Sequence, residues 1–213
     1  MRMNSPLIRF IAPFVLFLSA LAVRDVWDGP NVQTWLYPIQ TLLCLGLVIW
    51  WWRGYEIQPL RGTLWALGAG VLVFVVWVSP QMLFGMAPRT EGWDPASSPW
   101  YWGSLAMRFL RLVVVVALVE EIFWRGFLLR YLVKEDFTKV PFGTFSWLSF
   151  IVVSLFFVLE HGRADWPAAL VAGIVYNGVA FKTRSLSACV LAHGVTNLLL
   201  GGYVLWTRQW GFW

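Results

Sequence analysis

The sequence predicts an all-α polytopic membrane protein with about seven transmembrane helices, within a range of six to eight. Hydrophobic residues make up 59% of the 213 residues and charged residues 13%, about half of the roughly 25% that is typical of soluble domains. A soluble globule of this length could not bury 16 Trp and 16 Phe. The same composition excludes a disordered chain.

Seven apolar stretches are long enough, or nearly so, to cross the hydrocarbon layer, which takes about 20 residues. The predicted spans are 7–23, 33–52, 62–79, 102–122, 144–160, 166–181 and 186–206. No linker or repeat divides the chain, so we expect one membrane domain over 1–213, with a surface loop from Pro80 to Pro99. The first stretch has features of a cleaved signal, but six further apolar stretches favour an uncleaved helix.

Basic residues predict the orientation of these spans. A cytoplasmic N-terminus would place ten Lys and Arg residues inside and four outside, which agrees with the positive-inside rule. The inner set is Arg2, Arg9, Arg53, Arg61, Arg125, Arg130, Lys134, Lys139, Lys182 and Arg184, and the outer set is Arg24, Arg89, Arg163 and Arg208. This bias also explains the net charge of +5, and without a Lys/Arg-rich run we expect no nucleic-acid partner.

Ionisable residues inside apolar spans are costly and indicate functional sites. The first such cluster is Glu120, Glu121 and Arg125. Glu121 and Arg125 are four residues apart on one helical face and can form an ion pair. Glu120 is rotated by about 100° from its neighbour, so it has no such partner and is free to react.

Two further clusters contain both histidines of the chain. Phe157 and His161 are four residues apart, so the phenyl ring can pack beside the imidazole. His193 and Asn197 share another helical face, where Gly194 permits close approach. Cys44 and Cys189 lie within apolar stretches, adjoin no base in sequence and are interpreted as small core residues.

Together the three clusters suit the hydrolysis of an amide. A Glu and a His can activate water, while a His and an Asn can donate hydrogen bonds to an oxyanion. Glu120, His161 and His193 are also compatible with a catalytic zinc site, although the chain has no HExxH spacing. The absence of a GxSxG elbow argues against a serine mechanism.

The three motifs, Glu120-Glu121-x-x-x-Arg125, Phe157-x-x-x-His161 and His193-x-x-x-Asn197, resemble those of the CPBP family. This family comprises the CAAX-prenyl-protease (type II), bacteriocin-processing and Abi-like intramembrane endopeptidases. The resemblance covers about 104–206, the expected catalytic core, whereas 1–100 match only as additional N-terminal helices. It implies a catalytic cavity between the helices that carry the motifs.

The resemblance implies that Glu120 is the general base, that His161 helps it activate water, and that His193 and Asn197 stabilise the oxyanion. Glu121 and Arg125 would orient the site and Phe157 would pack in it. The cofactor is left open between a metal-free glutamate protease, which we favour, and a metalloprotease with a divalent ion such as zinc. We expect a membrane-anchored protein or peptide substrate, prenylated or carrying a sorting signal, and a location in the bacterial inner membrane; the oligomeric state is not predicted.

Two features depart from this scheme. Glu160 is not required by the motifs, and it could be a second base, a partner for Arg108 or Arg111, or the outer end of its span. The predicted topology also places Glu120 towards the cytoplasmic side and His161 near the outer side. Their cooperation therefore requires a longer fourth helix or a displaced fifth one.

Two other classes of function compete with proteolysis. The first is a non-catalytic membrane adaptor or immunity protein on the same scaffold, because fold does not determine function. The second is an ion-coupled transporter, which buried Glu and His residues could support. The intact Glu/His/His/Asn set argues against the former, and the lack of a visible inverted repeat argues against the latter.

Overall fold

The structure, a computed structural model, describes residues 5–26 and 32–213, and these fold as an all-α bundle without β-strands. The first three helices are α1 (Pro6–Val26), α2 (Val32–Trp50) and α3 (Thr63–Leu83). The last three are α7 (Trp147–Leu159), α8 (Trp166–Thr183) and α9 (Leu186–Thr207). Short 3₁₀ turns lie at Trp52–Gly54, Pro95–Ser97, Phe137–Lys139, Arg163–Asp165 and Trp210–Phe212.

One long helix lies between these two groups and runs without a break from Tyr101 to Tyr131. Its consecutive segments are α4 (Tyr101–Phe109), η3 (Leu110–Val116), α5 (Ala117–Glu121), η4 (Ile122–Leu128) and α6 (Leu129–Tyr131). The segments η3 and η4 are π-helical. Wide turns of this kind recur at functional sites, and here they flank the turn that carries Glu120 and Glu121.

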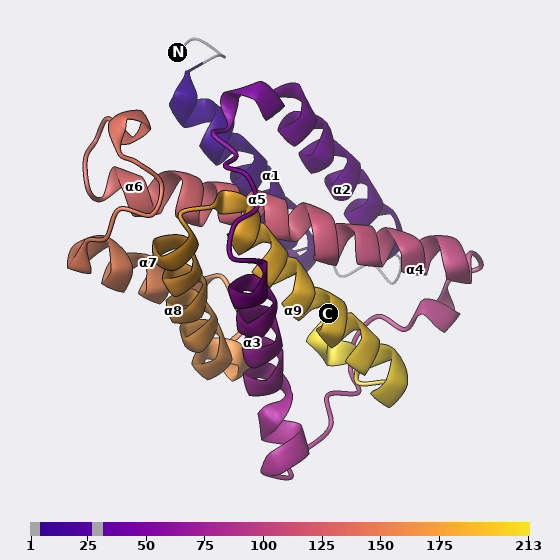
Figure 1. Cartoon of the computed structure of the whole chain (residues 1–213). Coiled ribbons are helices and arrows are strands. Elements are labelled where there is room, and N and C mark those ends of the chain that lie inside the picture. The colour runs from indigo at the N-terminus through magenta and orange to yellow at the C-terminus, as the bar shows by residue number, and fades with distance from the viewer. Residues whose placement is uncertain (1–4, 27–31) are drawn as a thin grey trace.

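The long helix crosses the middle of the molecule (Figure 1). Helices α1 and α2 pack together on one side of it, and α3, α8 and α9 pack together on the other, with α7 against α8. Phe14, Val119 and Ile122 are among the residues that form the continuous core along this helix. The all-α prediction is confirmed. Six of the predicted spans each coincide with one helix, and the fourth span falls within the long helix.

Two predicted boundaries are wrong. The fourth span was expected to end at 122, but the helix continues to Tyr131 because Phe127 and Leu129 keep burying apolar side chains in the core. Arg125 and Arg130, counted above among the basic residues on the cytoplasmic side, are therefore buried helical residues. Likewise, α3 passes through Pro80 and ends at Leu83, so the loop begins later than predicted.

Within the part of the chain that the structure describes, two helices, α3 and α9, are long and apolar enough to cross a membrane by length and composition alone. Three shorter stretches, Pro6–Ala20, Thr34–Trp50 and Trp147–Leu159, are apolar but fall below that length. Many large apolar side chains of α3 face outward, among them Leu64, Trp65 and Leu72. Such a surface suits lipid and would be costly in water.

Candidate active site

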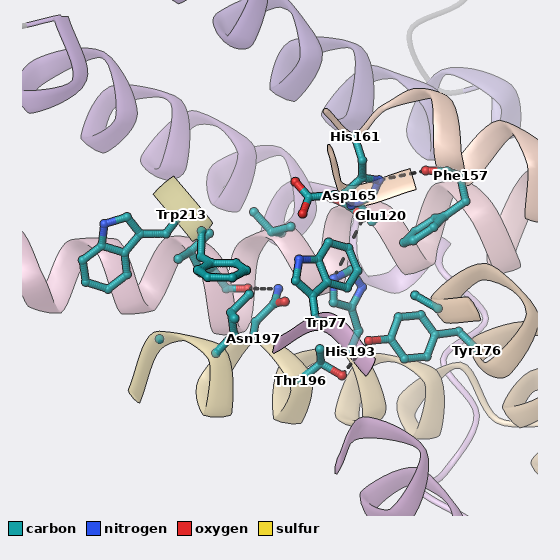
Figure 2. Close-up of a pocket in the computed structure, with 16 residues that line it drawn as sticks. Trp77, Glu120, Phe157, His161, Asp165, Tyr176, His193, Thr196, Asn197 and Trp213 are labelled. Carbon is teal, nitrogen blue, oxygen red and sulfur yellow. Dashed lines mark hydrogen bonds and ion pairs between the residues drawn. The ribbon is translucent and has the colours of Figure 1, made fainter. Parts of the chain in front are cut away.

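The three sequence motifs meet at one pocket of about 170 Å³. Glu120, His161, His193 and Asn197 all line this pocket, together with Phe157 (Figure 2). They come from the long helix, from the C-terminal end of α7 and from α9. The volume suffices for a few water molecules, whose share of liquid volume is about 30 Å³ each.

Of the two consecutive glutamates, Glu120 is the one that lines the pocket. Its side chain is only 6% exposed, and its Oε2 atom is buried without a hydrogen-bond partner among the described residues. The same oxygen lies 4.0 Å from Nε2 of His193. A buried carboxylate oxygen without a donor is costly, so this atom is available for a water or a substrate group.

His161 lies where α7 ends, at the rim of the pocket. Its Nδ1 atom is 2.8 Å from the carbonyl oxygen of Phe157, and its ring lies 5.3 Å from the Trp77 ring. A carbonyl oxygen only accepts hydrogen bonds, so Nδ1 must carry the proton and, in the neutral ring, Nε2 is left as a base. The Phe157 ring packs 5.0 Å from the imidazole, as its spacing in the sequence predicts.

His193 is held from two sides. Its Nδ1 atom lies 3.0 Å from Oε1 of Glu121, and its ring stacks on Tyr176 at 5.2 Å with an interplanar angle of 22°. The hydroxyl of Tyr176 in turn donates to Thr196. Because the Glu121 carboxylate accepts the Nδ1 proton, Nε2 is directed towards Glu120 and the pocket.

Glu121 and Arg125 form a fully buried ion pair beneath the pocket. The Nη1–Oε1 distance is 2.9 Å, and both side chains are 0% exposed. Arg125 also donates from Nε to the amide oxygen of Asn177 and from Nη2 to the carbonyl of Gly173. The contact that the spacing of Glu121 and Arg125 predicts is therefore present, and it belongs to a larger network.

Asn197 lies on the same side of α9 as His193, as its position four residues later predicts. Its Nδ2 atom donates to the backbone carbonyl of Leu112 in the π-helical segment η3, at 2.8 Å. An amide nitrogen carries two protons, so one N–H remains for a group in the pocket.

The possible zinc ligands line one pocket without forming a close group. Among the described residues, no group of three or more His, Cys, Asp or Glu side chains is placed to hold an ion. Nδ1 of His161 faces the Phe157 carbonyl and Nδ1 of His193 faces Glu121. These contacts leave Nε2 of each ring as the atom for a proton or a metal ion.

The longer fourth helix accounts for the meeting of Glu120 and His161. Glu120 lies well inside a helix that continues to Tyr131, and not near its end. It therefore lies at the depth where α7 ends, and both residues line one pocket. The first of the two geometries that their cooperation requires, a longer fourth helix, is present.

Several residues at the site were missed by the sequence interpretation. Asn177, fully buried on α8, bridges Arg125 and the hydroxyl of Ser154, and a polar residue in an apolar span was a signal that could have found it. Trp77, Tyr176 and Trp213 also line the pocket, but aromatic residues are too frequent in this chain to stand out.

One alternative for Glu160 was a contact with Arg108 or Arg111. The Oε1 atom of Glu160 accepts a hydrogen bond from the indole N–H of Trp124 at 3.1 Å. Arg108 and Arg111 line a different small pocket, which includes Tyr37. Glu160 therefore belongs with the motif residues and not with these arginines.

Comparison with known proteins gives one match. Residues 102–199 match the family model described as type II CAAX prenyl endopeptidase, Rce1-like. No curated protein and no solved structure matches the chain. The matched segment contains all three motifs and every candidate site residue named from them. Residues 102–199 are therefore similar to the Rce1-like type II CAAX prenyl endopeptidases, a family of membrane-embedded proteases, and this match supports the resemblance found in the sequence.

Proposed function

We propose that this protein hydrolyses a peptide bond near the C-terminus of a membrane-anchored substrate, by means of a water molecule activated by Glu120 and His161. The observation that carries the proposal is the Oε2 atom of Glu120, which has no hydrogen-bond partner among the described residues and lies in a pocket of about 170 Å³ that His161, His193 and Asn197 also line. The match of residues 102–199 to a peptidase family supports it.

In the first step the pocket water lies between Glu120 and Nε2 of His161. The Glu120 carboxylate can accept a proton. Nε2 of His161 can also accept one, because the proton of this ring is on Nδ1, which donates to the Phe157 carbonyl. As the water oxygen attacks the substrate carbonyl carbon, one of its protons passes to Glu120. That proton then goes to the leaving amine as the C–N bond breaks.

In the same step the substrate oxygen becomes negative and needs donors. The free N–H of Asn197 is one. His193 can be the other only when Nε2 is protonated, since its Nδ1 proton is donated to Glu121. The buried Glu121 carboxylate fixes the orientation of the ring, as a carboxylate does in hydrolase triads. Such donors typically contribute about 10²–10³ in rate.

The substrate itself is larger than the pocket and needs a second surface. An open depression of about 850 Å³ adjoins the pocket and shares His161 and Trp213 with it. Apolar side chains line much of the depression, among them Phe14, Leu18 and Phe156. This surface suits the apolar end of a lipidated CAAX-type tail or of a hydrophobic sorting signal.

We place the protein in the bacterial inner membrane with a cytoplasmic N-terminus. The support is the charge bias of the loops, in which Lys134 and Lys139 follow the long helix on the predicted cytoplasmic side. Removing the buried Arg125 and Arg130 from the count leaves eight residues against four, so the direction of the bias is unchanged.

The test is cleavage of a farnesylated CAAX peptide by the purified full-length protein in lipid nanodiscs. We expect Glu120→Gln to lower kcat by about 10³-fold, within the usual range for general acid–base catalysis, and His161→Ala to have a similar effect. The matched control is Glu135→Gln, which removes an exposed carboxylate from the loop after the long helix and should retain full activity.

Full activity in Glu120→Gln would contradict the mechanism. If the wild-type protein leaves the farnesylated peptide intact, the prenylated substrate class is wrong. A comparison of membrane proteomes with wild-type and Glu120→Gln protein then tests peptidase activity directly, because an uncut substrate should accumulate only with the variant. Metal analysis of the purified protein and activity after treatment with a chelator test the metal-free mechanism.

A further inference from the structure

We propose that a groove between α3 and α8 binds one anionic phospholipid, with an acyl chain along the groove and the headgroup at Lys182. This inference goes beyond the proposed function and does not depend on it. The groove has a volume of about 640 Å³ and shares no lining residue with the candidate active site.

The groove lies where α3 and α8 pack side by side (Figure 1). Glycines on both helices keep it open, because a Cβ atom on Gly68 of α3 or on Gly178 of α8 would meet nothing within 4 Å. Apart from Lys182, the remaining lining residues are hydrophobic: Leu64, Trp65, Ala69, Leu72, Val175 and Val179. An apolar groove on an outward-facing surface suits a hydrocarbon chain.

A basic group lies at one end of this groove. Helix α8 ends at Thr183 and α3 begins at Thr63. A Cβ atom on Gly62 would lie 2.7 Å from Cγ2 of Thr183, so the two helix ends meet at one level. Lys182 lies in the last turn of α8. The groove is therefore apolar along its length and positively charged at the end where both helices reach the same level.

The Lys182 side chain is directed over the groove. Its Nζ atom lies 5.3 Å from the centre of the Trp65 ring, which is 62% exposed. Lys182 forms no ion pair with a carboxylate among the described residues. Long basic side chains and Trp rings are typical of the level at which bilayer headgroups lie. The ammonium group is thus positioned for the phosphate of a lipid whose chain fills the groove.

The charge around this end indicates an anionic lipid. Two further exposed basic residues flank it, since Arg61 precedes Gly62 and Arg184 follows Thr183. In the part of the chain that the structure describes, neither arginine is paired with a carboxylate. Basic residues beside membrane helices attract anionic headgroups, and each one near the membrane surface raises the affinity by about fivefold.

A second protein segment would fit the groove less well. Among the lining residues, only Lys182 and the indole of Trp65 carry a side-chain group that can form hydrogen bonds. A helix packed over the groove would also cover the Lys182 charge, and burial of an unpaired charge is costly. A phospholipid leaves its headgroup in water and matches the division of the groove into a long apolar part and one basic end.

The test is native mass spectrometry of the purified full-length protein after incubation in detergent with phosphatidylglycerol, or with phosphatidylcholine of the same acyl chains. We expect the wild-type protein to retain one phosphatidylglycerol molecule and about fivefold less phosphatidylcholine. Gly178→Leu places a side chain in the groove and should abolish this retention. Lys182→Gln should weaken it by about fivefold, whereas Lys182→Arg should preserve it.

Matched controls make the same changes elsewhere in the chain. Gly202→Leu adds the same side chain on α9, where a Cβ atom also meets nothing within 4 Å. Lys134→Gln removes an exposed charge from the loop after the long helix. Both controls should retain phosphatidylglycerol as the wild type does. Circular dichroism shows whether each variant is folded, and Gly68→Leu, which fills the groove from α3, replaces Gly178→Leu if that variant does not fold.

Absence of retained phosphatidylglycerol from the wild-type protein would overturn the proposal. Equal retention by Gly178→Leu would overturn it as well, because the lipid would then bind elsewhere, and equal retention of the two lipids would contradict the role of Lys182. A wild-type dimer that Gly178→Leu converts into a monomer would show that a second copy of the chain occupies the groove, which also contradicts the proposal.

Discussion

Two neighbouring layers of the molecule surround their carboxylates differently. In the lower layer, the ion network of Glu121, Arg125, Asn177 and His193, the Oε1 atom of Glu121 receives two charge-assisted hydrogen bonds, at 2.9 and 3.0 Å. In the upper layer, the pocket wall, Glu120 forms no ion pair with Arg or Lys among the described residues, and its Oε2 atom lies 4.0 Å from Nε2 of His193. Both glutamates keep a buried Oε2 atom without a donor, so these consecutive residues of one helix differ in the cation that is paired with Glu121.

The difference separates the residues that fix the positions of the helices from the residues that are available to react. The ion network has partners on three helices, so it can fix the relative positions of the long helix, α8 and α9. In the pocket wall, the Glu120 carboxylate is buried without an Arg or Lys partner among the described residues, and buried polar groups of this kind are typical of sites that bind or react. Substitutions in the two layers should therefore have opposite signatures.

The largest effect on stability is expected for Glu121→Gln. This change leaves the Arg125 charge buried at 0% exposure without its counter-ion, and breaking a buried pair typically costs about 3–5 kcal/mol. Glu120→Gln should instead leave stability within about 1 kcal/mol of the wild type, because no donor to its Oε2 is lost. Denaturant unfolding of both variants in the same detergent measures the difference.

A double substitution sharpens this comparison. Glu121→Leu combined with Arg125→Leu removes both charges together, and it should be less destabilising than Glu121→Gln if the unpaired charge is the cause. Equal losses of stability in Glu120→Gln and Glu121→Gln would show that the two layers do not differ as described.

A smaller effect is expected where α9 approaches the long helix. A Cβ atom on Gly194 would lie 2.9 Å from the backbone carbonyl oxygen of Val113, which cannot move without its helix. Gly194→Ala should therefore cost about 1–3 kcal/mol and displace His193, lowering kcat. Small displacements at a reacting site can cost up to about 10²-fold in rate.

The matched control is Gly202→Ala on the same helix. A Cβ atom there meets nothing within 4 Å, so the substitution should be neutral or stabilise the helix by up to about 1 kcal/mol. If Gly194→Ala behaves like Gly202→Ala in unfolding and in peptide cleavage, the close helix approach is not what positions His193.

The sequence predicts the local part of this arrangement well. Hydrophobic composition and span length predict seven helices, and spacing of four residues predicts the contacts of Glu121 with Arg125 and of Phe157 with His161. These predictions hold because helical geometry alone brings residues four apart together.

What depends on contacts between distant segments could not be predicted in the same way. The bond from Arg125 to Asn177 and that from Asn197 to the Leu112 carbonyl join residues 52 and 85 positions apart. The segment from Pro80 to Pro99, expected as a surface loop, is another case. It contacts the C-terminal residues, since the amide of Gly211 donates to the Arg89 carbonyl. That contact brings Trp213 to the pocket, and no periodicity encodes it.

The smallest effect is expected for an ion pair far simpler than the buried network. Lys139 and Asp136 lie 2.7 Å apart in the loop after the long helix, with 73% and 44% of their side chains exposed. The hydrogen bond from Lys139 holds the pKa of Asp136 below its ordinary value. A lowered folded-state pKa means that this contribution to stability is present above the unfolded pKa and is lost as the pH falls through the folded one. Because water screens such pairs, Lys139→Ala should not measurably change unfolding at neutral pH. A loss comparable to that of Glu121→Gln would show that burial does not separate the two pairs.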